Sequence, residues 1–178
     1  MLELLRKRRS TRKFKESEVE KDKIDKLVKS VLLSPSSRNI RPWEFIVVTD
    51  KDVIQKLSKS KEHGSAFLKG APLSIVVIAD TDKSDVWVED TSIASILIQM
   101  EAESLGLGSC WVQIRKRQYN AQKSSEEYVR NVLDIPESYS VESIIGIGYP
   151  DEQRPCHLDE EMKIEKVHMN QYGLYYKF

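Results

Sequence analysis

The sequence predicts one α+β domain in which a central sheet lies between helices. Three observations support this prediction. Several segments place apolar residues at helical spacing, four short segments are rich in β-branched residues, and the two kinds alternate imperfectly along the chain. No repeat, low-complexity stretch or Pro/Gly-rich linker divides the 178 residues, so we expect a single domain over 1–178.

The first 80 residues predict three helices and two strands. LELLRKR near the N-terminus is expected to be helical and to fray at Ser10–Thr11. The second helix has its apolar face at Ile24, Leu27, Val28, Val31 and Leu32, and the stretch 34–37 stops it. WEFIVVT (43–49) predicts a strand, 50–59 a short helix capped by Asp50, and LSIVVIAD (73–80) a strand buried on both faces.

The longest helix is expected at about 85–105, and its middle is apolar almost all round. Because such a helix must be covered on every side, it indicates a subunit interface. A glycine of the stretch LGLG (105–108) is its expected C-cap, and strands at 109–114 and 141–150 flank a helix at about 124–133 that Ser124 caps. The polar tail, 151–178, carries scattered aromatic residues and is expected to run over a surface or across to a partner.

The overall composition excludes several classes of protein. Lys plus Arg number 28 and Asp plus Glu also 28, a balance that argues against a dedicated nucleic-acid binder. The apolar runs are too short for a membrane span, and the N-terminus does not read as a signal peptide, so we expect a cytoplasmic protein. Cys110 is expected to be a buried thiol, because no base accompanies it, and the scattered histidines predict no metal site.

Two stretches could bind a ligand. RRSTRKF (8–14) gathers four basic side chains and two hydroxyls where a helix ends, a mixture suited to a phosphate, although a solvated charged face fits equally well. SPSSRNIRPW (34–43) puts hydroxyls, an Asn and an Arg on a loop between a helix and a strand. Its two prolines could equally serve only a turn and a helix stop.

Taken in order, five segments resemble the nitroreductase family of FMN-dependent oxidoreductases in its short, single-domain form. They are RRSTRKF, PSSRNIRPWEFIVV at 35–48, FLKGAP before a strand, EDTSIASILIQMEAESLGLGSCWV at 89–112 and IGIGYPDEQRP at 145–155. The resemblance implies a three-layer fold with a mostly antiparallel sheet, and an intertwined homodimer whose FMN sites lie at the subunit interface. The tail would then extend over the partner.

The resemblance also assigns residues to the cofactor. Arg8 would bind the FMN phosphate, Arg9 and Ser10 would line the ribityl chain and pyrimidine edge, and Arg12 would lie near N1 and the C2 carbonyl. The backbone of Trp111, Val112 and Gln113 would meet the N5 edge, and Lys163 is the best candidate for a C-terminal phosphate ligand. From the other subunit would come the loop residues Pro35, Ser36, Ser37, Asn39 and Arg41.

The implied reaction is a ping-pong hydride transfer from NADH or NADPH to flavin N5, and on to a nitroaromatic, a quinone or a free flavin. It needs no catalytic side chain, because the chemistry resides in the cofactor. Three alternatives stay open: a non-catalytic FMN-binding or electron-carrier protein, a specialised flavin reaction on the same scaffold, and a nucleic-acid or phosphate-binding module that uses the basic cluster.

Overall fold

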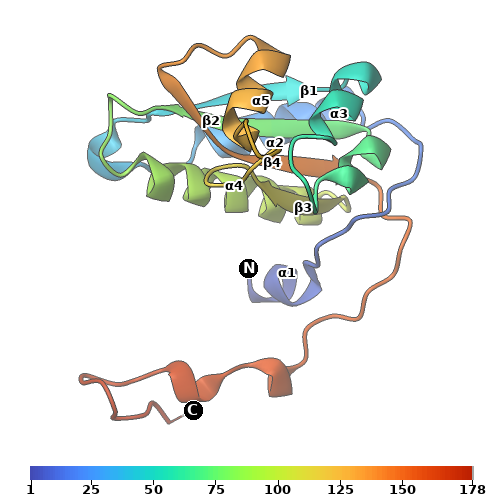
Figure 1. Ribbon diagram of the computed structural model, residues 1–178. Coiled ribbons are helices and arrows are strands. Elements are labelled where there is room, and N and C mark those ends of the chain that lie inside the picture. Colours follow the sequence, from blue (N-terminus) through green and yellow to red (C-terminus); the bar gives the residue numbers. More distant parts are fainter. Residues whose placement is uncertain (178) are drawn as a thin grey trace.

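The computed structural model describes residues 1–177, and its core is one antiparallel sheet (Figure 1). Among the described residues the sheet has four strands in the order β1-β2-β4-β3, and every neighbouring pair is antiparallel. The strands are β1 (Trp43–Val48), β2 (Leu73–Asp80), β3 (Gly108–Gln113) and β4 (Tyr139–Gly148). The predicted α+β class with an antiparallel sheet is therefore confirmed.

Helices cover both faces of this sheet, as Figure 1 shows. α2 (Lys21–Leu32) and α4 (Trp87–Ser104) pack on one face through a core that includes Leu27 and Ile98. α3 (Lys51–Leu57) and α5 (Ser125–Leu133) pack on the other through a second core that includes Leu57 and Val129. β2 lies in the middle and is buried from Leu73 to Ala79, as its continuous apolar sequence predicts.

The predicted helix caps are present. The Asp50 carboxylate accepts the backbone N–H groups of Asp52 and Val53 at 2.9 and 3.0 Å, and Ser124 Oγ accepts that of Glu127 at 3.1 Å. Gly106, with φ +73°, ends α4, and the N–H of Leu107 reaches back to the carbonyl of Ala102 at 2.8 Å. Short polar side chains and one glycine thus fix where these elements begin and end.

α4 has an apolar face that its own chain leaves open. Ala94 and Ile98 are fully buried against the sheet, whereas Ile93 and Ile96 are 41% and 39% exposed. The described residues therefore cover this helix on the sheet side and along α2, and leave it open at Ile93 and Ile96. None of the helices in residues 1–177 is long and apolar enough to cross a membrane.

Beyond β4 the chain passes α1 (Leu2–Lys7) and extends away from the sheet as an arm (Figure 1). The N–H of His157 donates to the carbonyl of Arg6 at 2.9 Å, and Arg6 pairs with Asp159 at 2.6 Å. Further along, the described part of the arm contains the short 3-10 helices η3 (Asp159–Glu161) and η4 (Ile164–Lys166) and a β-bridge between His168 and Tyr175. It carries a set of exposed apolar side chains: Leu158, Met162, Ile164, Val167, Met169, Tyr172, Leu174 and Tyr175.

The outer edge of β3 is partly covered by the basic N-terminal segment. Ser10 forms a parallel bridge with Ser109, and the N–H of Thr11 donates to the carbonyl of Ser109 at 3.0 Å. Gly108 makes this approach feasible, because a Cβ atom there would lie 2.5 to 2.8 Å from the side-chain atoms of Thr11. The segment continues to the end of β4, where Phe14 bridges Pro150.

Gly108→Ala should therefore destabilise the fold by about 1–3 kcal/mol, because the added methyl group overlaps the Thr11 side chain. Gly70→Ala in η2 (Ala66–Gly70) is the matched control, because a methyl group added there would meet no atom within 4 Å apart from its chain neighbours. Urea unfolding of the two variants measures the difference. Equal stability of both would show that the close contact between Thr11 and Gly108 is absent in solution.

Candidate functional site

The outer edge of β3 is where most predicted site residues of this chain meet. Ser109 accepts a hydrogen bond from the segment at this edge, and the Gln113 carbonyl accepts one from Lys61 Nζ at 3.4 Å. In an antiparallel pair, alternate residues turn both backbone groups to the same side, so the N–H and carbonyl of Trp111 face this edge too. Of the three residues whose backbone is expected to meet the cofactor ring, Trp111 and Gln113 therefore face the outer edge, whereas Val112 turns its backbone groups toward β4.

Guanidinium groups gather beside the start of β3. Cys110 is 2% exposed, and its burial raises the thiol pKa, while the nearby charges of Arg12, Arg8 and Arg154 act in the opposite direction. The low exposure confirms the expected buried thiol, and the raised pKa disfavours a nucleophilic role for it. It also shows that Arg154, from beyond β4, joins the two arginines of the N-terminal segment.

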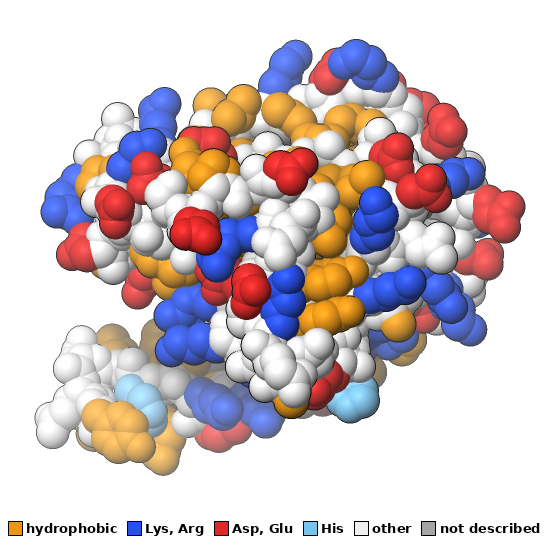
Figure 2. All heavy atoms as spheres, turned by 45° about the horizontal axis from the view of Figure 1, so that its top comes forward, with side chains coloured by type: hydrophobic (Ala, Val, Ile, Leu, Met, Phe, Trp, Pro, Cys, Tyr) orange, Lys and Arg blue, Asp and Glu red, His pale blue; other side chains and the backbone are white. Residues whose placement is uncertain are grey.

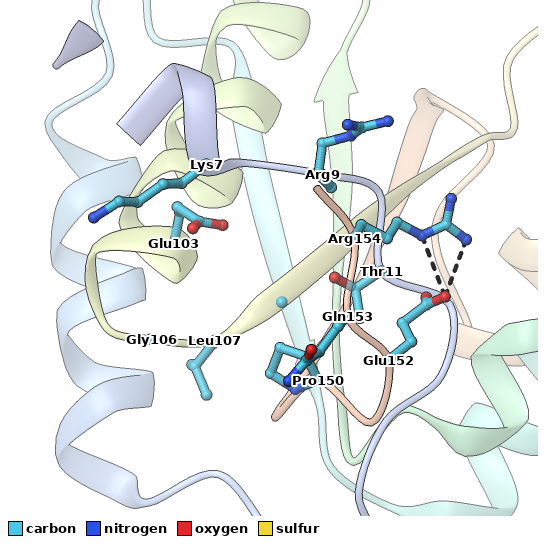
Figure 3. A pocket seen from close by; sticks show the side chains of 11 residues that line it. Lys7, Arg9, Thr11, Glu103, Gly106, Leu107, Pro150, Glu152, Gln153 and Arg154 are labelled. Carbon is cyan, nitrogen blue, oxygen red and sulfur yellow. Dashed lines mark hydrogen bonds and ion pairs between the residues drawn. The ribbon is translucent and has the colours of Figure 1, made fainter. Parts of the chain in front are cut away.

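A cavity of about 440 Å³ lies between α1, the turn after α4 and the segment that follows β4 (Figure 3). Its polar lining comes from Lys7, Arg9, Thr11, Glu103, Glu152, Gln153 and Arg154. Arg154 donates to Glu152 at 3.0 Å, and no ion pair joins Lys7 or Arg9 to the carboxylates drawn in Figure 3. The guanidinium of Arg9 donates to the carbonyl of Pro155 at 2.6 Å.

Glu152 holds the basic segment in place by hydrogen bonds to its backbone. Its carboxylate accepts the backbone N–H groups of Arg12 and Lys13 at 2.6 and 3.2 Å, as well as Arg154. These hydrogen bonds, the one from the Arg12 N–H first, lower the pKa of Glu152. The carboxylate thus fixes the segment and neutralises one guanidinium, and leaves Arg8 and Arg9 without an acidic partner among the described ion pairs.

The second predicted stretch lies at the other end of α4. The N–H of Ser37, in the 3-10 helix η1 (Ser37–Asn39), donates to Asp90 at 2.8 Å, and Arg38 pairs with Asp85. By contrast, the basic cluster lies near Glu103. Burial raises the pKa of Glu103, and the charge of Arg8 acts in the opposite direction. Thirteen residues separate Asp90 from Glu103, or about 20 Å along the helix. A single chain does not bring the two stretches together.

The loop itself has a defined shape. Arg38, Asn39 and Arg41 adopt φ values of 51°, 56° and 54°, a region that residues other than glycine rarely occupy. Ser36 Oγ accepts the N–H of Arg41 at 2.8 Å, and Asn39 Oδ1 accepts Arg41 Nε at 2.9 Å. Strained backbone held by such side chains is common at ligand-binding loops. Pro35 is the second residue of this stretch and lies three residues after the end of α2.

Lys163 stands apart from the basic cluster. It is exposed in the arm, directly before η4, and no described ion pair joins it to another residue. Arg154 and Lys61 are the cationic residues that sequence reasoning missed. Arg154 stands in the stretch IGIGYPDEQRP and could have been identified from it, whereas no sequence pattern marks Lys61, which lies on the loop after α3.

The buried carboxyl group of Glu142, in β4, is hydrogen-bonded to the side chain of Gln113 in β3. The indole N–H of Trp111 donates to Gln113 at 2.9 Å, and Gln113 Nε2 donates to Glu142 Oε1 at 3.3 Å. Glu142 is 3% exposed, and its Oε2 has no hydrogen-bond partner among the described residues. Burial raises the pKa of Glu142, while Gln113 and Arg115 act in the opposite direction.

Glu142→Gln should stabilise the protein more at neutral pH than near pH 4.5, the ordinary pKa of the group. Because the folded-state pKa is raised, the stability that this carboxyl contributes below its unfolded pKa is lost as the pH rises through the folded pKa. The amide removes that loss and keeps the acceptor for Gln113. Urea unfolding at both pH values, with the exposed Glu137→Gln as control, measures the effect, and an equal change at both would contradict a raised pKa.

Charged side chains of both signs are interspersed over the body on the face shown in Figure 2. In the described chain no group of three or more His, Cys, Asp and Glu side chains is placed to hold a metal ion. The concentration of cations along β3 is therefore a local feature of a neutral protein.

Comparisons with known proteins identify close relatives. A sequence profile described as "Nitroreductase family" matches residues 5–64 and 58–149. The structure of an FMN-dependent nitroreductase from Clostridium difficile R20291 is 51% identical, with a TM-score of 0.96 over 97% of this chain and 100% of that one. A protein of Archaeoglobus fulgidus, provisionally named NADH dehydrogenase/NAD(P)H nitroreductase, is 33% identical over 94% of this chain and 95% of its own length. The FMN reductase [NAD(P)H] of Bacillus subtilis is 25% identical over 92% and 72%.

Proposed function

The chain belongs to the nitroreductase family, and we propose that it is an FMN-dependent oxidoreductase that takes reducing equivalents from NADH or NADPH. Its acceptor would be a nitroaromatic, a quinone, a free flavin or a related small molecule. The observation that supports this best is the position of the basic segment, which meets the outer edge of β3 at Ser109 and brings Arg8 and Arg12 close enough to influence Cys110, as Arg154 also does.

The residues at the start of β3 fit the phosphate of FMN. Arginine can hold a phosphate with two parallel hydrogen bonds, and Arg8 and Arg9 have no acidic partner of their own among the described ion pairs. Ser10 adds a neutral hydroxyl, and Arg154, which follows β4, also lies near the start of β3. The adjoining cavity of about 440 Å³ lies within the usual range for ligand sites.

The site would be completed by a second copy of the chain. The loop with Ser36, Ser37, Asn39 and Arg41 lies about 20 Å along α4 from the basic cluster, so one chain supplies only half of the predicted ligands. The exposed Ile93 and Ile96 on α4 favour a partner against that helix. In this homodimer the arm, with its exposed apolar side chains, would lie over the partner subunit.

In this proposed function the protein binds the cofactor and orients it. FMN, when bound, supplies the hydride-transfer chemistry. Arg8 and Arg9 would hold its phosphate, the backbone of Trp111 to Gln113 would align the ring edge, and Arg12 would lie near the pyrimidine. Cys110, neutral and buried, would act only as packing. No side chain is required as a general acid or base.

The purified protein is expected to show the absorption of oxidised flavin, as isolated or after addition of FMN. Anaerobic NADH or NADPH should bleach it rapidly, and a quinone or nitroaromatic should restore it. If neither nucleotide reduces the bound flavin, the protein is an electron carrier and not an NAD(P)H-dependent enzyme. A colourless protein that takes up no FMN would contradict the proposed function altogether.

A further inference from the structure

Three side chains form a hydrogen-bonded network that joins β4 to the part of β3 expected to meet the flavin ring. We call Trp111, Gln113 and Glu142 the Glu142 network. The indole N–H of Trp111 donates to Gln113 Oε1 at 2.9 Å, and Gln113 Nε2 donates to Glu142 Oε1 at 3.3 Å. Because an indole N–H can only donate, Gln113 Oε1 must accept from it, and Nε2 must face Glu142. The amide of Gln113 therefore has one orientation, in which Glu142 Oε1 is the acceptor.

A β-bulge places Glu142 at this point of the sheet. In the pairing of β2 with β4, the partners of Val77 and Ile78 are two residues apart, so Glu142 is an extra residue of β4 with no partner in β2. Its carbonyl accepts the N–H groups of both Ile114 and Arg115, at 3.1 and 3.2 Å, where β3 ends. Bulges redirect a side chain and are common next to active sites. Glu142 thus holds the end of β3 through its carbonyl and the neighbouring side chain through its carboxyl group.

The second carboxyl oxygen of Glu142 determines the charge of the network. The residue is 3% exposed, and its Oε2 has no hydrogen-bond partner among the described residues. Because Oε1 accepts from Gln113, a proton on this carboxyl group lies on Oε2. The network is neutral while that proton is present, and its loss leaves a negative charge in the interior.

The surroundings of Glu142 compensate this charge only weakly. Arg115, which follows β3, attracts it, whereas Glu126, in the first turn of α5, repels it and is itself paired with Arg130 at 3.5 Å. From α4, Ser95 presents only a hydroxyl to β4, at 3.0 Å. None of the described ion pairs includes Glu142, and its burial is the largest influence, which raises the pKa of the carboxyl group.

The network ends at the backbone that is expected to align the flavin. Trp111 and Gln113 both turn their N–H and carbonyl groups to the outer edge of β3. An ionised Glu142 would therefore lie one side chain away from a ring that gains negative charge when it is reduced. Two like charges at such a separation in a protein interior oppose each other. The reduced flavin and the protonated carboxyl group should accordingly favour each other.

We infer that Glu142 is a positioning residue of the cofactor site, which fixes Trp111 through Gln113 and takes up a proton when the flavin is reduced. This inference rests on the proposed function. NADH or NADPH supplies a hydride, which carries two electrons and one proton to the flavin, and solvent supplies the proton that the carboxylate of Glu142 binds. Oxidation of the flavin by the acceptor returns that proton to solvent.

The link between Glu142 and Trp111 can be tested in the flavin-free protein. Nitrogen-15 labelling of the three tryptophans gives their indole N–H resonances, and Trp111→Phe identifies that of Trp111. This resonance should shift as the pH rises above 4.5, the ordinary pKa of the carboxyl group, because ionisation strengthens the hydrogen bond from Gln113. Glu142→Gln, which removes the titrating group, and Gln113→Leu, which removes the link, should each abolish the shift. The exposed Glu137→Gln should keep it.

The flavin potential, measured against pH, tests the uptake of the proton. Wild type and Glu142→Gln should have equal potentials at the acid end of the range, where the wild-type carboxyl group is protonated. As the pH rises, the wild-type potential should become the more negative, because the carboxylate opposes the reduced flavin. The final difference is about 30 mV for each tenfold by which reduction raises the proton affinity of Glu142. Glu137→Gln should follow the wild type at every pH.

Two results would overturn the inference and leave the proposed function intact. One is a Trp111 resonance that does not titrate in the wild type, or that titrates equally in Glu142→Gln. The other is a constant difference in potential between wild type and Glu142→Gln at every pH. If the wild-type protein binds no flavin, the proposed function fails, and the role of Glu142 at the cofactor fails with it.

Discussion

The candidate site depends on one constraint: β3 is the last strand of the sheet, and its outer edge is available for binding. The N-terminal segment reaches that edge through the bridge between Ser10 and Ser109, which the missing side chain of Gly108 allows. Glu152 then holds the following backbone N–H groups in place. Edge strands expose unpaired backbone groups and are usually protected. Here basic side chains lie beside the edge, so an anionic ligand could contact both the unpaired backbone groups of β3 and the cationic side chains.

α4 sets the second constraint because it separates the two predicted halves of the site. The loop at Ser37 is tied to its first turns and the basic cluster lies beside its last ones. Since a helix is rigid, no small movement within one chain can join them. The exposed Ile93 and Ile96 and the apolar arm are then explained together by the proposed dimer. Family membership, the divided site and the uncovered surfaces support the same assembly.

Much of the fold could be predicted from the sequence because it depends on local signals. Asp50, Ser124 and Gly106 mark element ends through hydrogen bonds and backbone geometry that each residue type favours, and the apolar run at 73–80 marks the buried strand. The basic motif was also recognisable. The contact of Lys61 with the Gln113 carbonyl could not be predicted, because tertiary packing brings the loop after α3 to β3. The neutralisation of Arg154 by Glu152 likewise requires the three-dimensional structure.

In the proposed homodimer, each cofactor site combines the β3 edge of one chain with the 35–41 loop of the other. Co-expression of an Arg8→Ala chain with an Asn39→Gly chain, followed by isolation of the mixed dimer, tests it most directly. Glycine keeps the positive φ of position 39 and removes only the side chain. Each parent dimer is expected to bind FMN weakly, and the mixed dimer is expected to regain one tight site, because one of its two sites contains neither substitution. A mixed dimer with no tight site would show that each chain binds FMN by itself.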